Sequence, residues 1–263
     1  MNVFGRRPSG RLSFFDWNQR TALPFPGVAI LDPLQTGRSL MDVSQAVDQR
    51  ISTRAFTDQQ ISADEVRDWL QTAQRAPSGG NLQPWRVIAV AGDEKQAVID
   101  LAQKKLAGNP RGEPTDRPIY PADLWEPHSS RRFRVGEMMY DKLGIPREDK
   151  AARIQWFSRN FRFFDAPLAI FFVIDERMGH GQWAHTGMFM QTLALLAEER
   201  GWGSCFQECW GILRPTLKEH FGLGESEMVY CGMAVGYPDL DHPVNQLRAE
   251  RAMVEEFAEL KGF

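Results

Sequence analysis

Three polar side chains occupy alternate positions in the string Arg-Ile-Ser-Thr-Arg at residues 50–54. Arg50 and Arg54 carry guanidinium groups, and Ser52 places a hydroxyl between them. Guanidinium groups donate paired, charge-assisted hydrogen bonds to phosphate oxygens, and one of them could instead reach a ring carbonyl. Three solvated polar residues would be the better explanation if this string stood alone. It therefore predicts an anion site only in combination with other signals.

A second string with chemical potential reads Pro-Ser-Gly-Gly-Asn-Leu-Gln-Pro-Trp at residues 77–85. Its two glycines allow the backbone to approach a flat or charged group, and its two prolines restrain both ends. The amides of Asn81 and Gln83 each carry donors and acceptors, which suits recognition of the edge of a heteroaromatic ring. An ordinary turn between a helix and a strand is the alternative for the first four residues alone.

Several common catalytic patterns are missing from the sequence. There is no Gly-x-Gly-x-x-Gly after a strand, no phosphate-loop lysine motif and no Gly-x-Ser-x-Gly. His180 and His185 lack zinc-protease spacing, and Cys205 and Cys209 lack Cys-x-x-Cys spacing. We therefore expect neither a dedicated dinucleotide-binding domain nor a metal site, and we interpret Cys209 and Cys231 as small apolar core residues.

Composition is that of an ordinary globular enzyme, with 43% hydrophobic and 25% charged residues. The formal net charge of −3 provides no electrostatic basis for binding nucleic acid. Three cysteines are an odd number, which favours a reducing compartment over a disulfide framework. The longest apolar run, residues 166–174, is too short to span a bilayer. These features predict a cytoplasmic protein without a membrane or nucleic-acid partner.

Helix signals flank both strings. Asp42 can cap a short helix, Val43–Gln49, that delivers residues 50–54. Ser62 and Glu65 fit a capping box for a helix that feeds residues 75–85. Asp93 and Gln96 are expected to cap a helix that ends near Gly108. Further helices are expected over residues 130–143, 149–161, 182–200 and 215–222, with a last amphipathic helix through Val254 and Phe257. The helix at 182–200 has little polar surface in its middle, so we expect burial on most sides, in a core or across a dimer interface.

Runs rich in β-branched and aromatic residues predict strands near 86–91, 168–175, 204–207 and 228–236. Residues 1–40 hold several prolines and aromatics, and we interpret them as an extended arm or, equally, as a floppy tail. Residues 109–165 begin as an irregular, proline-rich segment and continue as two helices. They could form a lid over a site within a domain of residues 41–263, or an ordinary helical hairpin with a solvated basic face.

Four separated strings together resemble the FMN-dependent nitroreductase family. The first two are residues 50–54 and 77–85. The third is Gly-Ser-Cys-Phe-Gln-Glu at residues 203–208, and the fourth is Gly-Tyr-Pro-Asp at 236–239, followed by Arg248 and Arg251. The Tyr-Pro-Ala-Asp-Leu-Trp string within residues 109–165 resembles the branch of nitrobenzoate and dinitroaniline reductases. The resemblance spans about residues 42–263.

This resemblance implies an α+β, three-layer fold, with a mixed and mainly antiparallel sheet between helices, in an intertwined homodimer with flavin at the interface. It implies that Arg50 and Ser52 hold the FMN phosphate together with Arg248 or Arg251. Arg54 would lie at the N1 and O2 edge of the flavin, where a guanidinium stabilises the negative charge of the reduced ring. The remaining residues that it implies around the cofactor are Ile51, Pro77, Ser78, Asn81 at the pyrimidine edge, and Gln207 and Glu208, whose backbone would face N5.

The implied activity is NAD(P)H-dependent reduction of nitroaromatics in two-electron steps, through nitroso to hydroxylamine, by a ping-pong mechanism. NADPH or NADH would bind transiently, and the flavin N5 rather than a side chain would carry the chemistry. Tyr120 and Trp125 could stack on an electron-poor ring. Arg131, in a cluster with Arg132 and Arg134, could favour a carboxylate-bearing substrate, or the cluster could be a solvated helix face. The alternatives are other flavin chemistry, namely reductive dehalogenation or quinone or enone reduction, and a non-enzymatic flavin-binding protein.

Overall fold

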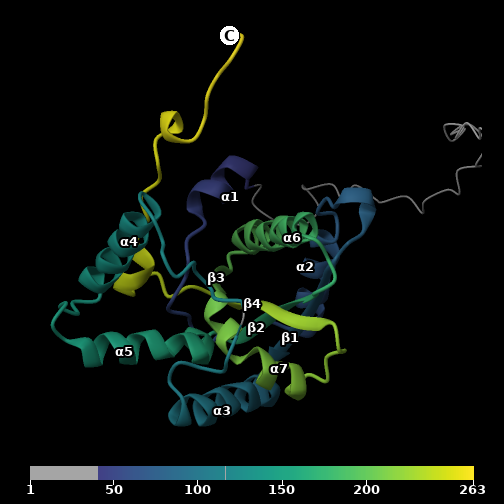
Figure 1. Ribbon diagram of the computed structural model, residues 1–263, viewed down its shortest axis with the longest axis vertical. Coiled ribbons are helices and arrows are strands. Elements are labelled where there is room, and N and C mark those ends of the chain that lie inside the picture. Colours follow the sequence, from purple (N-terminus) through teal and green to yellow (C-terminus); the bar gives the residue numbers. More distant parts are fainter. Residues whose placement is uncertain (1–40, 116) are drawn as a thin grey trace, which may run out of the picture. The chain divides into compact units, whose positions relative to one another are not determined.

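The computed structural model describes residues 41–263 except residue 116, so the predicted arm at residues 1–40 lies outside the described residues. A four-stranded antiparallel sheet with the strand order β1-β2-β4-β3 organises the described part (Figure 1). Its strands are β1 (Trp85–Ala91), β2 (Leu168–Asp175), β3 (Gly203–Gln207) and β4 (Glu227–Gly236). All four predicted strands are confirmed within one or two residues.

Both faces of the sheet are covered, which explains why β2 reads as an apolar run. Ala169, Phe171 and Val173 pack into one hydrophobic core, while alternate residues such as Ile170 and Phe172 pack into another. Successive side chains of a strand point to opposite faces, so a strand buried on both faces needs apolar residues throughout. The sheet is therefore the middle of three layers, and the predicted α+β class is confirmed.

Helices α1 (Val43–Gln49), α2 (Ala63–Ala73) and α6 (His180–Glu199) belong to the layer on one face of the sheet. Both predicted N-terminal caps are present, at Asp42 and at Ser62 with Glu65. Trp69 of α2 is fully buried and donates its indole N–H to the backbone carbonyl of Leu193, at 3.0 Å. This contact fixes α2 against α6, and α2 in turn leads into residues 75–85.

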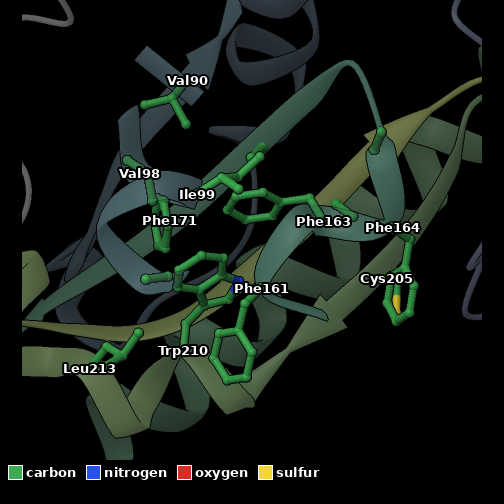
Figure 2. Close-up of a cluster of buried hydrophobic side chains, with 14 of the residues drawn as sticks. Val90, Val98, Ile99, Phe161, Phe163, Phe164, Phe171, Cys205, Trp210 and Leu213 are labelled. Carbon is green, nitrogen blue, oxygen red and sulfur yellow. The ribbon is translucent and has the colours of Figure 1, made fainter. Parts of the chain in front are cut away.

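Helices α3 (Gly92–Gly108), α5 (Lys150–Ser158) and α7 (Arg214–His220) pack around the other core, together with the 3-10 segments η3 (Arg159–Asp165) and η4 (Glu208–Leu213). Trp210 lies at the centre of this core (Figure 2). Phe163 stacks on it with a centroid distance of 4.6 Å, and Phe161 and Phe171 contact it edge-on. The core thus ties η3 and η4 to the sheet beside the end of β3.

Segment η3 contains two aromatic residues in the left-handed region, Phe163 at φ 53° and Phe164 at φ 52°. Such a conformation costs an L-residue about 1–2 kcal/mol. Both rings are buried, so their packing offsets that strain. The predicted helix at 149–161 therefore ends earlier, at Ser158, and the turn places Asn160 against the end of β3.

Helix α4 (His128–Lys142) completes the regular structure, with three short 3-10 turns at η2 (Gly79–Asn81), η5 (Pro243–Gln246) and η6 (Val254–Glu256). The predicted C-terminal helix is wrong, because only η6 forms there. Met253, Val254 and Phe257 are all exposed, and an isolated short helix without a packing surface is marginal in water. The predicted side-chain cap of α3 is also wrong, since this helix follows β1 directly at Ala91. Among the described helices, none is long and apolar enough to cross a bilayer.

Candidate functional site

Residues 50–54 run beside β3 at one edge of the sheet. Ser52 forms a parallel bridge with Ser204, and the Thr53 amide donates to the Ser204 carbonyl at 2.9 Å. The Arg54 amide donates to the side-chain oxygen of Asn245 at 2.8 Å. Close approach is possible because residue 203 is glycine: a Cβ there would meet the Thr53 side chain at less than van der Waals distance. The backbone that carries the two arginines is therefore rigidly held.

A cavity of about 790 Å³ opens where this segment meets α1 and the C-terminal segment. We call it the anion cavity. Ser52 lines it together with four arginines: Arg50, Arg54, Arg248 and Arg251. Two predicted strings that lie about 200 residues apart in sequence thus meet in one place.

The two C-terminal arginines are positioned by backbone carbonyls. Arg248 donates to the carbonyls of Asp48 and Gln49, at 2.6 and 3.1 Å, and so caps the end of α1. Arg251 donates to the carbonyls of Ala249 and Glu250. Neither interaction neutralises the guanidinium charge. The anion cavity therefore concentrates positive charge that a phosphate could balance.

A second cavity, of about 690 Å³, adjoins the first, and we call it the ring cavity. The two cavities share Arg54, Val135 and Leu247. Aromatic side chains dominate the ring cavity: Tyr120, Tyr140, Trp156, Phe157, Phe164 and Phe206. The combined space is thus cationic at one end and aromatic at the other, with Arg54 at the junction.

Gln207 and Glu208 lie at the end of β3 and line the ring cavity, as does Asn160. The side-chain amide nitrogen of Gln207 donates to the backbone carbonyl of Asn160 at 2.7 Å. The side-chain oxygen of Gln207 is buried and accepts no hydrogen bond within the described residues. Burial raises the pKa of Glu208, and Arg214 offsets this only in part. An unsatisfied buried acceptor is uncommon in folded proteins, so it marks this wall as a place for a ligand donor.

Two thiols, Cys209 and Cys231, also line the ring cavity. Burial raises the pKa of both thiols well above the ordinary value. They therefore stay protonated at neutral pH and are poor nucleophiles, because the thiolate is the reactive form. Both are small, apolar core residues, as interpreted from the sequence, and both also face a cavity.

Glu198 on α6 is an ionisable residue near the anion cavity that sequence inspection missed. Burial raises the pKa of its carboxyl to about 7, and the nearby Arg50 and Arg248 lower it only partly. A phosphate bound among these arginines would favour the protonated form further, because two negative groups would otherwise be close together. No sequence signal singles out this glutamate, since Glu199 beside it reads the same.

We expect Glu198 to make stability fall with rising pH. In the unfolded chain the carboxyl ionises near pH 4.5, whereas in the folded protein it holds its proton to about pH 7. The folded state therefore binds the extra proton between these values, and stability is lost as pH rises through that window. Because the group is only partly buried, we expect a contribution of about 1–2 kcal/mol.

Urea unfolding at pH 5, 6, 7 and 8 measures this contribution. Glu198→Gln should flatten the decline between pH 5 and 8, while the exposed neighbouring change Glu199→Gln should leave it as in the parent protein. An identical decline in Glu198→Gln and the parent protein would show that another group is responsible.

Residues 77–85 lie at the opposite edge of the sheet, leading into β1. Strands β2 and β4 separate β1 from β3, which corresponds to roughly 14 Å across the sheet. Consistent with this separation, none of the three residues Pro77, Ser78 and Asn81 lines the anion cavity or the ring cavity. A single chain thus does not bring these predicted cofactor residues to Arg50 and Arg54.

The loop is nevertheless well organised. Gly80, Asn81 and Gln83 all adopt left-handed conformations, with φ between 48° and 58°. Ser78 accepts a hydrogen bond from the Gln83 amide at 3.0 Å, and the Gly79 amide donates to a ring nitrogen of His185. Left-handed residues cost energy and persist where the surroundings enforce them, often at functional sites. The loop is therefore a preformed and largely exposed surface.

The three residues expected to face a substrate separate in the structure. Tyr120 lines the ring cavity. Trp125 is 60% exposed, contacts His128 edge-on and lines neither cavity. The structure directs Arg131 elsewhere, to an ion pair with Glu256 at 2.9 Å. Helical periodicity explains this, because a neighbour one residue along a helix points about 100° away, and it is Arg132 that lines the ring cavity.

The chain is similar to known proteins over most of its length. A sequence model described as the nitroreductase family matches residues 47–237. The chain is 34% identical over 215 residues to a nitrobenzene nitroreductase of Ectopseudomonas oleovorans, covering 82% of this chain and 95% of that one. It is 33% identical over 224 residues to a 4-nitrobenzoate reductase of Pseudomonas putida, covering 84% and 96% of the two chains.

A solved structure provides the same answer for the fold. The FMN- and NADPH-dependent nitroreductase NfnB from Sphigopyxis sp. strain HMH superposes with a TM-score of 0.82 at 41% identity, covering 85% of this chain and all of that one. The resemblance inferred from four short strings is thereby confirmed over most of the described chain.

Proposed function

Because this chain belongs to the nitroreductase family, we propose that it is an FMN-dependent NAD(P)H nitroreductase that acts on nitroaromatic compounds. The observation that carries the proposal is the pair of joined cavities, one lined by four arginines and the other by aromatic rings. This arrangement fits a cofactor that has a phosphate at one end and a flat ring at the other. The solved structure at 41% identity is named as FMN- and NADPH-dependent, which supports the same pair of cofactors here.

Arg50 and Ser52 would hold the phosphate, with Arg248 and Arg251 contributing from the C-terminal segment. Ile51 lines the same cavity. Arg54, at the junction of the two cavities, would lie beside the ring and stabilise negative charge there. When bound there, FMN would supply the chemistry for hydride transfer between NAD(P)H and the nitro group.

The side chains of the ring cavity would bind and orient rather than react. Gln207 and Glu208 form the wall at the end of β3, and the nearby thiols remain protonated. Reduction of a nitro group to hydroxylamine takes two hydrides from two NAD(P)H and two protons, passes through the nitroso compound and releases one water. Water that enters the open cavity could supply the protons, so no nucleophilic side chain is required.

We further propose that the working form is a homodimer in which the second copy supplies residues 77–85. Two observations support this. The loop is preformed but exposed, at the sheet edge away from its own anion cavity. Exposed apolar side chains on α1, α6 and the C-terminal segment are also available for burial against a partner: Val43, Val47, Met188, Met253, Phe257 and Leu260. Pro77, Ser78 and Asn81 of one chain would then face the flavin held by the other.

Nicotinamide and nitroaromatic should use the ring cavity in turn, which predicts ping-pong kinetics. Both would need the same exposed face of the bound flavin to exchange hydride with it, so they could not occupy the cavity together. We expect purified protein to be yellow, NADPH to bleach it without a nitro compound, and the nitro compound to restore the colour after NADP⁺ is removed. Double-reciprocal plots with both substrates varied should show parallel lines.

Colourless protein that takes up no FMN would refute the proposed function. Intersecting lines, together with a stable complex of enzyme, NADP⁺ and nitroaromatic, would refute the shared cavity while leaving the cofactor assignment in place.

A further inference from the structure

Helix α4 divides its arginines between two faces. Arg132 lies on the face that lines the ring cavity, with Val135, Gly136, Met139 and Tyr140 at the following helical positions. The next face lines a separate cavity of about 280 Å³ between α4 and the C-terminal segment, with Arg131 and Arg134 on it. Residues three or four apart share a helix face, so this division follows from the helical period once α4 is packed.

The arginines on the face of α4 toward the C-terminal segment are neutralised by ion pairs. Arg131 pairs with Glu256 at 2.9 Å, and Arg134 pairs with Glu250 at 2.7 Å. Arg132 differs, because within residues 41–115 and 117–263 it makes no ion pair. Its guanidinium instead lies over the ring of Tyr120, 4.3 Å from the centroid. An arginine stacked on an aromatic ring keeps its charge and its outward donors while its orientation is restrained.

We propose that Arg132, seated on Tyr120, recognises an anionic substituent, namely a carboxylate, on the nitroaromatic substrate. This inference rests on the proposed function of the same site. Removing a carboxylate from water without a partner is unfavourable, whereas a neutral nitroaromatic needs no such partner. Arg132 should therefore discriminate between charged and neutral substrates without affecting the reaction itself.

The other charges of the ring cavity leave this role to Arg132. Arg54 lies at the junction with the anion cavity, where the cofactor would engage it. Glu208 is the acidic group among the lining residues, and it repels an anion whenever it is ionised. A carboxylate on the substrate ring is thus drawn toward α4 and away from the end of β3. Phosphates of the nicotinamide nucleotide are a competing source of negative charge, and kinetics can separate the two.

The test compares three variants of the FMN-loaded enzyme: Arg132→Gln, Arg132→Lys and the matched neighbour Arg131→Gln. Arg132→Gln should raise KM for 4-nitrobenzoate by roughly 5- to 30-fold, because it removes a partly exposed charge-assisted contact. KM for nitrobenzene, methyl 4-nitrobenzoate and NADPH should change by less than about 2-fold, and kcat should be retained. Arg132→Lys should recover part of the loss, and Arg131→Gln should resemble the parent enzyme.

Calorimetry on the oxidised enzyme provides a readout independent of turnover. Binding of 4-nitrobenzoate should weaken in Arg132→Gln by a factor similar to the change in KM, while Arg131→Gln binds normally. Equal losses for 4-nitrobenzoate and nitrobenzene, an equal loss in Arg131→Gln, or a loss confined to NADPH would overturn the inference. If the parent enzyme reduced neither compound, the proposed function would fail by itself, and calorimetry would still decide whether Arg132 binds the carboxylate.

Discussion

Replacing Arg50 with alanine should weaken FMN binding by roughly 10- to 150-fold, equivalent to about 1.5–3 kcal/mol for a lost hydrogen bond to a charged group. Arg50 lines the anion cavity, and within the described residues its guanidinium has no ion pair or side-chain hydrogen bond. A phosphate would be its principal partner, so truncation removes that contact and, besides it, only the electrostatic effect of Arg50 on Glu198. Titration of the apoprotein with FMN, followed by quenching of FMN fluorescence, measures the change.

Two comparisons make the Arg50 result specific. Arg67→Ala removes an exposed arginine of α2 that pairs with Asp64, and it should leave FMN affinity unchanged. Arg54→Ala should act chiefly on the reduction potential of the bound flavin, because Arg54 lies where the two cavities meet. If the Arg50 and Arg54 variants both kept full FMN occupancy and an unchanged potential, the assignment of the phosphate and ring ends would be wrong.

Two inactive variants should complement each other if each site is built from two chains. Arg50→Glu reverses a charge in the anion cavity, and Asn81→Asp replaces an amide donor with a carboxylate in the loop at the opposite sheet edge. Aspartate tolerates the left-handed conformation of residue 81, so the loop should keep its shape. In a heterodimer of the two variants, one site carries both substitutions and the other carries neither.

Co-expression with two different tags and successive purification on both isolates this heterodimer. Its nitroreductase activity should reach about half that of the parent dimer, whereas each variant homodimer should be nearly inactive. A tagged heterodimer of the parent chain with Arg50→Glu provides the control, since it also retains one intact site. If every site were made within one chain, the mixed dimer would remain as inactive as the homodimers. A monomer at micromolar concentration in sedimentation would refute the shared site more directly.

The strands and the first helices could be predicted because their signals are local. The cap at Asp42, the capping box of Ser62 and Glu65, and the apolar run of β2 depend on neighbours within a few residues. The C-terminal helix could not be predicted this way. Its amphipathic pattern is real, but an apolar stripe forms a stable helix only against a surface, and the described part of the chain provides none there.

The candidate site shows the same division between features that are local in sequence and features that depend on folding. Sequence by itself determined which chemical groups this protein carries: the guanidinium and hydroxyl string at 50–54, the amide-bearing loop at 77–85 and the arginines near the C-terminus. Taken together, the strings were enough to show a resemblance to the FMN-dependent nitroreductase family, because a motif can be matched to a family without knowing how the chain folds. The sequence motifs do not tell how far apart these groups lie in the folded protein.

Only the tertiary structure decided how these groups are distributed in space. Pairing of residues 50–54 with β3 brought Arg50 to Arg248, while the strand order placed Asn81 at the far edge. Packing of α4 turned Arg132 rather than Arg131 toward the ring cavity. Burial raised the pKa of Glu198, although the nearby Arg50 and Arg248 oppose that rise. Each of these outcomes depends on contacts between residues distant in the chain, and such contacts exist only once the sheet and its two covering layers have assembled.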